Sequence, residues 1–399
     1  MRLVGNGPWS MRLVYFCYFF GSASYITFAV LYWRSIHLSG AQIGLIASIG
    51  PLAGLAMQPA WGFLSDRYRL RTRLLGAGLL TSALVAPALL LSHRFVLIVL
   101  LVVALAIALS PIIPLADATT LEWVQRHGGT YGGIRVFGSL AFVVGSLVAG
   151  PLLGGGRIAL VFPFFGGALA LAFLAALAAP RQETPGHARH VEGMGSLLRQ
   201  RRLLLFLVLA GIGFGTAASY NTFFALYMHD VGAGTGIIGI AAAMASSSEL
   251  PVMAFSGRLI ARLGVKRLLM IGLGAGAARW LWYGLVHDYR LALIAQVFHG
   301  LSFAASYVAG ITYMDLHVPS HLRSTGQTLF YASTFGIGTI AGANLFGSLL
   351  STLGIHGIYI LAGALATVSV AGIGVFVPGG QEPSHEEGLA DAGLSRGAS

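Results

Sequence analysis

The sequence has little of what a soluble or secreted protein relies on. It contains a single cysteine, Cys17, so neither a disulfide framework nor a cysteine-rich metal site is available. Only 9% of its 399 residues are charged, and Asp and Glu together number 13. Soluble domains carry about 25% charged residues, so a soluble globular fold is excluded. Neither G-x-x-x-x-G-K-[ST] nor H-E-x-x-H occurs, and we therefore expect no enzyme, no cofactor and no bound metal.

What the sequence does contain is apolar. Hydrophobic residues make up 56% of the chain, and 55 residues are glycine, which lets membrane helices pack closely. An apolar run of about 20 residues is long enough to cross a bilayer as a helix. The start, MRLVGNGPWSMRLVYF, has no small-residue cleavage site and is interpreted as a retained first helix. The runs predict twelve spans, near 13–34, 41–64, 74–92, 95–121, 131–153, 158–179, 203–228, 236–258, 267–286, 291–314, 325–350 and 356–378.

One long polar connection divides these spans into two sets of six. It is PRQETPGHARHVEGMGSLLRQRR, residues 180–202. We expect an all-α membrane protein with an N-terminal six-helix bundle over 1–179, a cytoplasmic linker over 180–202 and a C-terminal six-helix bundle over 203–378. The polar remainder, 379–399, is expected to be a disordered cytoplasmic tail.

The net charge of +11 does not indicate a nucleic acid partner, because of where the charges lie. Most of the 24 Lys and Arg residues stand on alternate connections or in the two tails, and the opposite connections hold few. Positive charge marks the cytoplasmic loops of membrane proteins. Both termini are therefore predicted to be cytoplasmic, and we expect the protein to lie in the cytoplasmic (inner) membrane of a bacterium.

An internal repeat supports the two halves. GFLSDRYRLRTRLL (62–75) and GRLIARLGVKRLLM (257–270) each connect the second and third spans of their half. The first copy resembles the loop motif of the major facilitator superfamily, G-x-L-x-D-R-x-G-R-[KR], at Gly62, Leu64, Asp66 and Arg67. In the second copy Ala261 replaces the acid. The resemblance implies two pseudo-symmetric bundles that rock about a central site, and we expect the protein to act as a monomer.

In that family the acid and arginine of the loop hold neighbouring helices together on the cytoplasmic side. The resemblance therefore implies a gating role for the motif positions Gly62, Asp66, Arg67 and Arg71. Asp66 and Arg67 are the expected latch. The other arginines of the segment, Arg71 included, are expected to be mostly surface charge. The alternative for the whole segment is a basic loop that faces lipid headgroups.

Ionisable residues inside spans are rare and by default functional. Asp117, late in span four, and Arg135, early in span five, lie at equal distances from Arg126 in the loop between them. We therefore expect them to form an ion pair at one depth. The string YGGIRVFGSLAFVVGS (131–146) resembles the fifth helix of the phenylpropionate and lactose permease branch. That resemblance implies that Asp117 and Arg135 bind substrate; the alternative is a salt bridge that only pairs two helices.

A second set of ionisable residues lies in the C-terminal half. Glu249 is the only charge in ASSSELPVMAF (245–255). Glu249 and Arg279 each lie about 15 residues from Gly264, roughly 22 Å along a helix, which reaches the bilayer middle. His299 lies at a similar depth on the next span. An acid, a guanidinium and an imidazole on three consecutive helices predict a proton-coupling site with a second ion pair, and lactose permease carries the same types there; a packing histidine is the alternative.

Departures from lactose permease bear on the solute. Ser302 stands where that branch has a proton-transferring glutamate, and Gln296 where it has a lysine. Val252 replaces a sugar-bonding asparagine, and Phe142 replaces a sugar-stacking tryptophan. Proton coupling would need a different carrier, and sugar recognition loses two contacts. The departures favour the aromatic-acid side of the branch.

Further substrate contacts are expected on spans one, five and seven, although packing is the alternative for such residues. The candidates are Tyr18, Phe142, Tyr220 and Asn221. Three prolines are expected to break helices near the site, namely Pro111, Pro114 and Pro251.

These observations predict a secondary active transporter. We expect proton-coupled symport of a small organic solute, of the aromatic acid, saccharide or nucleoside class, by alternating access. Its partners would be the solute, protons and the lipid bilayer. The alternative is a proton-driven exporter of a drug or metabolite in the same fold. A polar, charge-paired cavity favours import, whereas a mostly apolar cavity with one acid would favour export.

Overall fold

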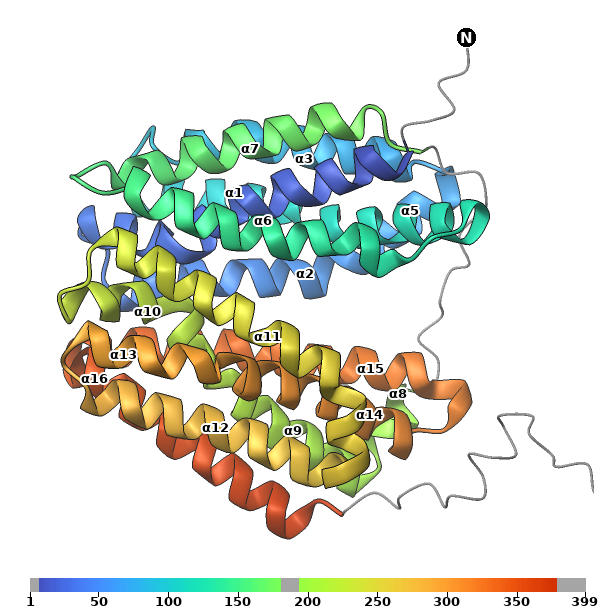
Figure 1. Ribbon diagram of the computed structural model, residues 1–399, viewed down its shortest axis with the longest axis vertical. Helices are drawn as coiled ribbons and strands as arrows, with labels where there is room; N and C mark the ends of the chain where they lie inside the picture. Colours follow the sequence, from blue (N-terminus) through green and yellow to red (C-terminus); the bar gives the residue numbers. More distant parts are fainter. Residues whose placement is uncertain (1–6, 181–193, 379–399) are drawn as a thin grey trace, which may run out of the picture.

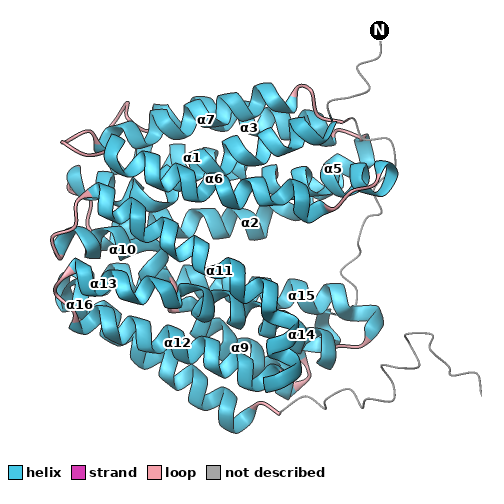
Figure 2. Ribbon diagram, viewed as in Figure 1, coloured by secondary structure: helices cyan, strands magenta, loops and turns pink. Residues whose placement is uncertain are grey.

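The computed structural model describes residues 7–180 and 194–378, and every regular element in these ranges is a helix (Figure 2). The first range contains α1 (Gly7–Ser35), α2 (Gly40–Tyr68), α3 (Arg71–Ala88), α4 (Phe95–Leu109), α5 (Ile112–His127), α6 (Tyr131–Leu152), the 3₁₀ turn η1 (Ile158–Leu160) and α7 (Val161–Ala176). The predicted tail, 379–399, and most of the predicted linker lie outside the described residues.

The second range forms the other half of the molecule. Its α-helices are α8 (Met194–Leu198), α9 (Arg201–Gly215), α10 (Ala218–Asp230), α11 (Thr235–Leu263), α12 (Val265–Leu285), α13 (Tyr289–Ile294), α14 (Ser306–His317), α15 (Arg323–Tyr331) and α16 (Thr339–Phe376). Four shorter segments depart from α-helical geometry: the 3₁₀ turns η2 (Ala295–Phe298) and η4 (Ser320–Leu322), and the π-helical segments η3 (Leu301–Ala305) and η5 (Ala332–Gly338). Figure 1 shows α1–α7 packed as one layer of the molecule and α8–α16 as the other.

Ten helical segments of the described residues are long and apolar enough to cross a membrane. The all-helical membrane fold is therefore confirmed. The predicted third span falls on α3, which is not among the ten. The last two predicted spans fall on one segment, Ser320–Phe376, which is interrupted at Gly354, where φ is 68°. The count of twelve spans stays a prediction.

Two of the long segments are broken near their middle, and a tryptophan braces each break. α4 ends at Leu109 and α5 begins at Ile112, while Ser110 between them accepts a 3.0 Å hydrogen bond from the Trp61 indole. Thr216, between α9 and α10, accepts the same bond from Trp280, also at 3.0 Å. Such side-chain bonds help to satisfy the interrupted backbone in a membrane.

Of the three prolines predicted to break helices, only those near the start of α5 lie at a break. Pro111 precedes the first residue of α5, as the sequence predicts, and Pro114 lies in the first turn of that helix. Pro251 lies inside α11 without interrupting it, so the predicted break there is wrong.

The two halves meet closely at one end of the molecule. That end is the one farther from α8. The other end, near α8, where α2 leads into α3 and α11 into α12, is called the linker end; it is on the right in Figure 1. The opposite end carries the connection between α1 and α2. There Gly44 of α2 lies directly against the carbonyl of Ala343 in α16, and Gly239 of α11 lies against the carbonyl of Ser146 in α6. Only glycine permits such close backbone contacts between helices.

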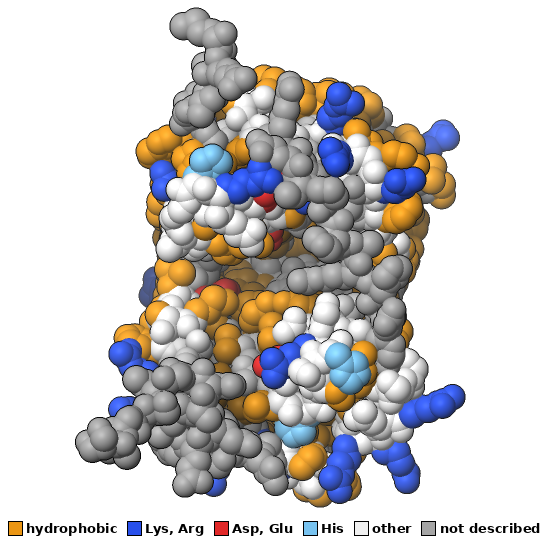
Figure 3. Space-filling view, turned by 90° about the vertical axis from the view of Figure 1, so that its right-hand side faces the viewer, with side chains coloured by type: hydrophobic (Ala, Val, Ile, Leu, Met, Phe, Trp, Pro, Cys, Tyr) orange, Lys and Arg blue, Asp and Glu red, His pale blue; other side chains and the backbone are white. Residues whose placement is uncertain are grey.

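One hydrogen bond adds to this contact. The Asn344 amide nitrogen of α16 donates to the Ser48 hydroxyl of α2 at 2.7 Å. At the linker end the halves separate, and Figure 3 shows a hollow between them with acidic side chains inside it and Lys and Arg on both rims. The structure is thus closed at the opposite end and open at the linker end.

Candidate functional site

A central cavity of about 310 Å³ lies between the halves. It is lined by helices from both, and it brings together six of the predicted site residues: Arg135, Phe142, Tyr220, Asn221, Glu249 and His299. Polar side chains of Ser139 and Ser246 and the rings of Phe19 and Phe224 complete much of its wall. The wall thus combines apolar rings with several convergent polar and charged groups, and such convergence of polar groups in a cavity is typical of small-molecule sites.

Two further spaces adjoin it. A cavity of about 540 Å³ is lined mainly by the N-terminal half and includes Tyr18 and Asn221 in its wall. A small space of about 50 Å³ lies on the other side, next to Asn221, Arg279 and His299. Asn221 borders all three spaces. Asp117 lines none of them, so it is not a direct wall residue of the cavity.

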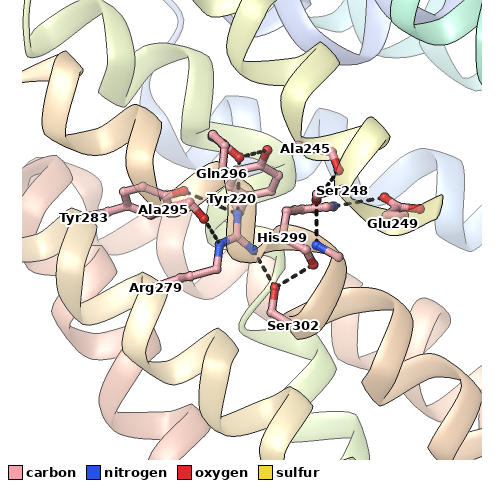
Figure 4. A network of polar contacts seen from close by, with 11 residues as sticks. Tyr220, Ala245, Ser248, Glu249, Arg279, Tyr283, Ala295, Gln296, His299 and Ser302 are labelled. Carbon is pink, nitrogen blue, oxygen red and sulfur yellow. Dashed lines mark hydrogen bonds and ion pairs between the residues drawn. The ribbon is translucent and has the colours of Figure 1, made fainter. Parts of the chain in front are cut away.

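Glu249 and His299 form an ion-pair geometry on the cavity wall (Figure 4). Nε2 of His299 lies 3.1 Å from Oε1 of Glu249. The side chain of Glu249 is 24% exposed and that of His299 is 13% exposed, so both are largely shielded while they still reach the cavity. A carboxylate and an imidazole at this distance can share or exchange a proton.

The backbone around His299 explains how the two side chains meet. His299 stands between the 3₁₀ turn η2 and the π-helical segment η3, an irregularity that is frequent at functional sites. The next residue, Gly300, packs against the carbonyl of Ser248 in α11, and its N–H donates to the Ser248 hydroxyl at 2.8 Å. The absence of a side chain at Gly300 lets α11 come close enough for Glu249 to reach His299.

Arg279 is buried, with 3% of its surface exposed, and no ion pair joins it to Glu249 in the described part of the chain. The predicted ion pair is therefore wrong. Instead the guanidinium donates to the Ala295 carbonyl at 3.1 Å and to the Ser302 hydroxyl at 2.7 Å. Longer bonds reach the Tyr283 hydroxyl at 3.3 Å and Oε1 of Gln296 at 3.4 Å. Figure 4 shows these groups around Arg279.

Aromatic rings surround the same guanidinium. Its central carbon lies 4.9 Å from the ring centre of Tyr220, 5.0 Å from that of Trp280 and 5.7 Å from that of Tyr283. Ring faces attract a cation, and this attraction grows when water is excluded. Neutral oxygens and rings thus hold the positive charge in place of a carboxylate. The Tyr220 hydroxyl also donates to Oε1 of Gln296 at 3.0 Å, which connects the cavity wall to the Arg279 environment.

Asp117 has other partners than the predicted one. Its carboxylate accepts hydrogen bonds from the hydroxyls of Tyr15 at 2.6 Å and Tyr131 at 3.0 Å. No ion pair joins it to Arg135 among the described residues, so that prediction is wrong too. The Arg135 guanidinium lies over the rings of Phe19, at 4.3 Å, and Tyr15, at 5.2 Å. Tyr15 thus contacts both Asp117, through its hydroxyl, and Arg135, through its ring. Of these two ionisable residues, only Arg135 lines the central cavity.

The loop motif of the N-terminal half contains one buried ion pair. Arg71, at the start of α3, is 8% exposed and lies 2.6 Å from Glu122 of α5. Arg126 lies 3.1 Å from the same carboxylate. The prediction that Arg71 is mostly surface charge is therefore wrong. Arg67 and Gly62 are exposed in the last part of α2, and the side chain of Asp66 lies outside the described residues.

Three residues with polar contacts near the predicted ones are not among the candidates from the sequence. One is Glu122, which lies one helical turn before Arg126. Tyr131 and Tyr283 each stand four residues from an arginine of the site, Arg135 and Arg279. Residues at this spacing share a helix face, so the signal was present in the sequence.

Comparison with known proteins places the chain in a family. The profile of the MFS_1 like family matches residues 8–361. The chain is 34% identical over 363 residues to the maltose permease of Geobacillus stearothermophilus, which covers 90% of this chain and 91% of the permease. It is 27% identical over 359 residues to the probable 3-phenylpropionic acid transporter of Escherichia coli strain K12, with 88% and 92% covered.

Solved structures agree on the fold. The crystal structure of a mutant of the nucleoside transporter NupG superposes with a TM-score of 0.84 at 16% identity, covering 93% of this chain and 100% of that one. At this identity the likeness shows the fold alone.

Because the family profile spans most of the chain, the protein belongs to the MFS_1 like family of the major facilitator superfamily: it is an integral membrane transporter of small solutes and not an enzyme.

Proposed function

We propose that the protein is a proton-coupled symporter that imports a small organic solute across the cytoplasmic membrane by alternating access. The observation that carries the proposal is the Glu249–His299 pair, 3.1 Å apart on the wall of a cavity between two halves. A titratable pair in this position can bind a proton while the solute occupies the same space. The two binding events are then physically coupled.

The charge of the surrounding cluster explains how the proton affects the transport cycle. The cluster consists of Glu249, Arg279 and His299. Arg279 carries a permanent charge, and no ion pair joins it to a carboxylate among the described residues. A proton on Glu249 or His299 changes the net charge of the cluster by one. Because uncompensated charge is expensive in a low-dielectric interior, the two protonation states favour different arrangements of the surrounding helices. The proton therefore biases which end of the carrier opens.

Arg135 supports an anionic, aromatic solute. Its guanidinium borders the cavity, lies over aromatic rings and has no carboxylate partner in the described chain. A planar guanidinium binds a carboxylate through two parallel hydrogen bonds. Phe142 and Phe224 on the same wall offer apolar faces for a ring. Relatives are named for maltose and for 3-phenylpropionic acid, and the charge of Arg135 favours the latter class over saccharides and nucleosides.

The basic residues and the open end support the orientation. Arg67, Arg201 and Arg267 all belong to the linker end, and positive charge favours the cytoplasmic side. The conformation is then inward-facing, with both termini cytoplasmic. We also propose that the protein works as a monomer. In this orientation Asp66 and Arg67 sit at the cytoplasmic end of α2, where a latch would control closure of the open side.

One observation favours the alternative of a proton-driven exporter. The adjoining cavity of about 540 Å³ has a largely apolar wall, including Tyr25, Val30 and Trp33, which would suit a hydrophobic drug or metabolite. The direction of coupling separates the two functions, because a symporter moves solute with the protons and an exporter moves it against them.

The test uses purified protein in sealed vesicles with an imposed pH gradient. Labelled 3-phenylpropionate, maltose and uridine are offered outside at acidic pH with an alkaline interior. The proposal expects accumulation of the aromatic acid beyond that in protein-free vesicles, and this excess should collapse when a proton ionophore is added. Accumulation only when the interior is acidic would establish the exporter instead. Exchange that ignores the pH gradient would refute proton coupling.

A further inference from the structure

An apolar groove of about 620 Å³ runs along the outside of the C-terminal half, between α9 and the segment formed by α15, η5 and α16. Its walls include Leu204, Val208 and Ile212 of α9 on one side and Ile337 and Leu345 on the other. These side chains are exposed, so the groove faces the space that a bilayer fills. It is separate from the central cavity.

Glycine creates the depth of this groove. Gly211 and Gly215 of α9 stand one turn apart, as do Gly338 and Gly342 on the facing span, and all four line the groove. A side chain on Gly215 would lie 2.7 Å from the Gly338 carbonyl, so the two backbones touch. The Ser333 hydroxyl adds a 2.6 Å bond to the Leu207 carbonyl. Small residues let membrane helices pack closely. Here the four glycines form the bottom of the groove, and the larger apolar side chains on either side form its walls.

The groove is capped by positive charge at the linker end. Leu198, the last residue of α8, lines the groove and is followed by the exposed Arg199. Arg201 begins α9 and is exposed as well. It stands three residues before Leu204, so by helical spacing it heads the same stripe as Leu204, Val208 and Ile212. No acidic residue occurs between Met194 and Gly215.

We propose that this groove binds an anionic phospholipid, with one acyl chain between α9 and η5 and the phosphate at Arg199 and Arg201. α9 is 15 residues long, about 22 Å at the rise of an α-helix, which matches one leaflet: about 15 Å of hydrocarbon plus the headgroup region. Basic residues at the end of an intramembrane groove are the expected recognition element for an anionic headgroup. An apolar groove alone would accept any lipid, whereas the two arginines select for charge.

The lipid groove is also connected to the contact between the two halves. η5 is a π-helical segment, and Gly336 within it packs against the Leu55 side chain of α2 in the other half. Segments of this kind are locally irregular and often mark positions that rearrange. A lipid that packs on the outer face of η5 therefore supports a segment whose other face contacts the opposite bundle.

Native mass spectrometry of the purified full chain tests the proposal. The protein is titrated with phosphatidylglycerol and with phosphatidylcholine of the same acyl chains. The proposal expects one retained phosphatidylglycerol at a concentration well below that needed for phosphatidylcholine. Arg199→Gln and Arg201→Gln should each weaken retention of phosphatidylglycerol about fivefold, the contribution of one basic residue near a membrane surface. Phosphatidylcholine retention should not change.

Two further variants separate charge from shape. Arg267→Gln removes an exposed cation at the linker end of α12, away from the groove, and should leave the preference intact. Ala341→Phe fills the groove at an exposed position and should abolish the tightly retained lipid with either headgroup. Melting temperatures confirm that each variant is folded.

Three results would overturn the proposal. The first is equal retention of the two lipids by the unmodified protein, and the second is unchanged preference in the Arg199→Gln, Arg201→Gln double variant. The third is a photoactivatable phenylalanine at position 341 that captures a peptide from residues 181–193 instead of lipid. That result would make the protein's own linker the occupant of the groove.

Discussion

The imidazole of His299 lies 3.1 Å from the carboxylate of Glu249, although the two residues are 50 positions apart in the chain. Neither side chain has another charged partner in the described structure. The pair borders the cavity, whereas Arg279 is held by neutral oxygens behind it. Proton binding at this pair therefore changes the charge of the site itself and not that of a distant salt bridge.

Glu249→Gln is the direct test of proton coupling. The amide mimics a protonated acid but cannot release its proton, so we expect solute binding and exchange to continue while accumulation is lost. One pH unit is worth about 1.36 kcal/mol per proton, which supports about tenfold accumulation for one proton per solute. Uptake driven by a pH gradient in vesicles measures the difference.

Asp315→Asn is the matched control for that variant. Asp315 forms an exposed ion pair with Arg323 at 3.1 Å, at the linker end and away from the cavity. Its loss should leave accumulation unchanged. If the Glu249→Gln protein still accumulates solute in response to the gradient, the proton is carried by another group, and Asp117 is the next candidate.

Gly300→Ala tests whether close helix approach maintains the pair. A side chain at this position would overlap the Ser248 carbonyl, so α11 must move away and the Glu249–His299 distance must increase. Such overpacking costs about 1–3 kcal/mol. We expect a lower melting temperature together with a loss of pH-driven uptake.

Gly274→Ala provides the comparison. Gly274 of α12 has open space around it, and alanine favours a helix by up to about 1 kcal/mol over glycine. Its stability should be equal or higher and its transport normal. Equal behaviour of the two alanine variants would show that the contact at Gly300 is not required.

Arg135→Lys examines recognition of the solute. Lysine keeps the charge but loses the planar fork that grips a carboxylate, and it cannot stack in the same way on Phe19. Loss of a charge-assisted bond corresponds to about ten- to hundredfold weaker binding. Isothermal titration with the aromatic acid measures the effect, and Arg157→Lys in an exposed loop serves as control. Unchanged affinity would remove Arg135 from the site.

The sequence predicts that Glu249, Arg279 and His299 lie near one another, and the structure places them around adjoining cavities but not with the predicted partners. Equal distances from a loop, as for Glu249 and Arg279 about Gly264, fix how far each side chain lies along the membrane normal. They do not fix the rotation of each helix about its own axis. The 3₁₀ and π segments on either side of His299 turn that residue toward Glu249, and no simple periodicity predicts them.

The same limit applies to the ion pairs that the sequence predicted. A buried arginine was expected to need a carboxylate, but Arg279 is surrounded by Ser302, Gln296 and aromatic rings instead. In the sequence, Ser302 and Gln296 stand out only as substitutions relative to lactose permease. The helices themselves were predictable because long apolar runs leave the chain little choice in a bilayer. The uninterrupted α11 shows that a proline such as Pro251 need not break a membrane helix.

Asp66→Asn tests the latch. Removal of the charge should leave solute affinity within a few-fold of normal, because the residue lies at the linker end of α2, far from the cavity wall. Exchange across the membrane should slow markedly if Asp66 holds neighbouring helices together in one conformation. Counterflow rates measure this, with Asp230→Asn in the exposed end of α10 as control. Normal counterflow in the Asp66 variant would refute the gating role.

Gly44→Val tests the closed end of the molecule. A side chain at Gly44 would overlap the Ala343 carbonyl of the other half, so α2 and α16 can no longer pack as they do here. The neighbouring Ser48–Asn344 bond, at 2.7 Å, should break with them. We expect the population to shift toward a conformation that opens at the end opposite the linker.

A cysteine in the cavity reports the shift. Ser139→Cys in a Cys17→Ser background lines the central cavity, and a membrane-impermeant thiol reagent added from the side opposite the linker should label it faster when Gly44→Val is present. Gly50→Val is the control, because Gly50 lies on the same helix with nothing near its missing side chain. Faster labelling with Gly44→Val alone would establish that backbone contact through glycine holds this end closed. Equal labelling in both variants would show that the closure depends on other contacts between the halves.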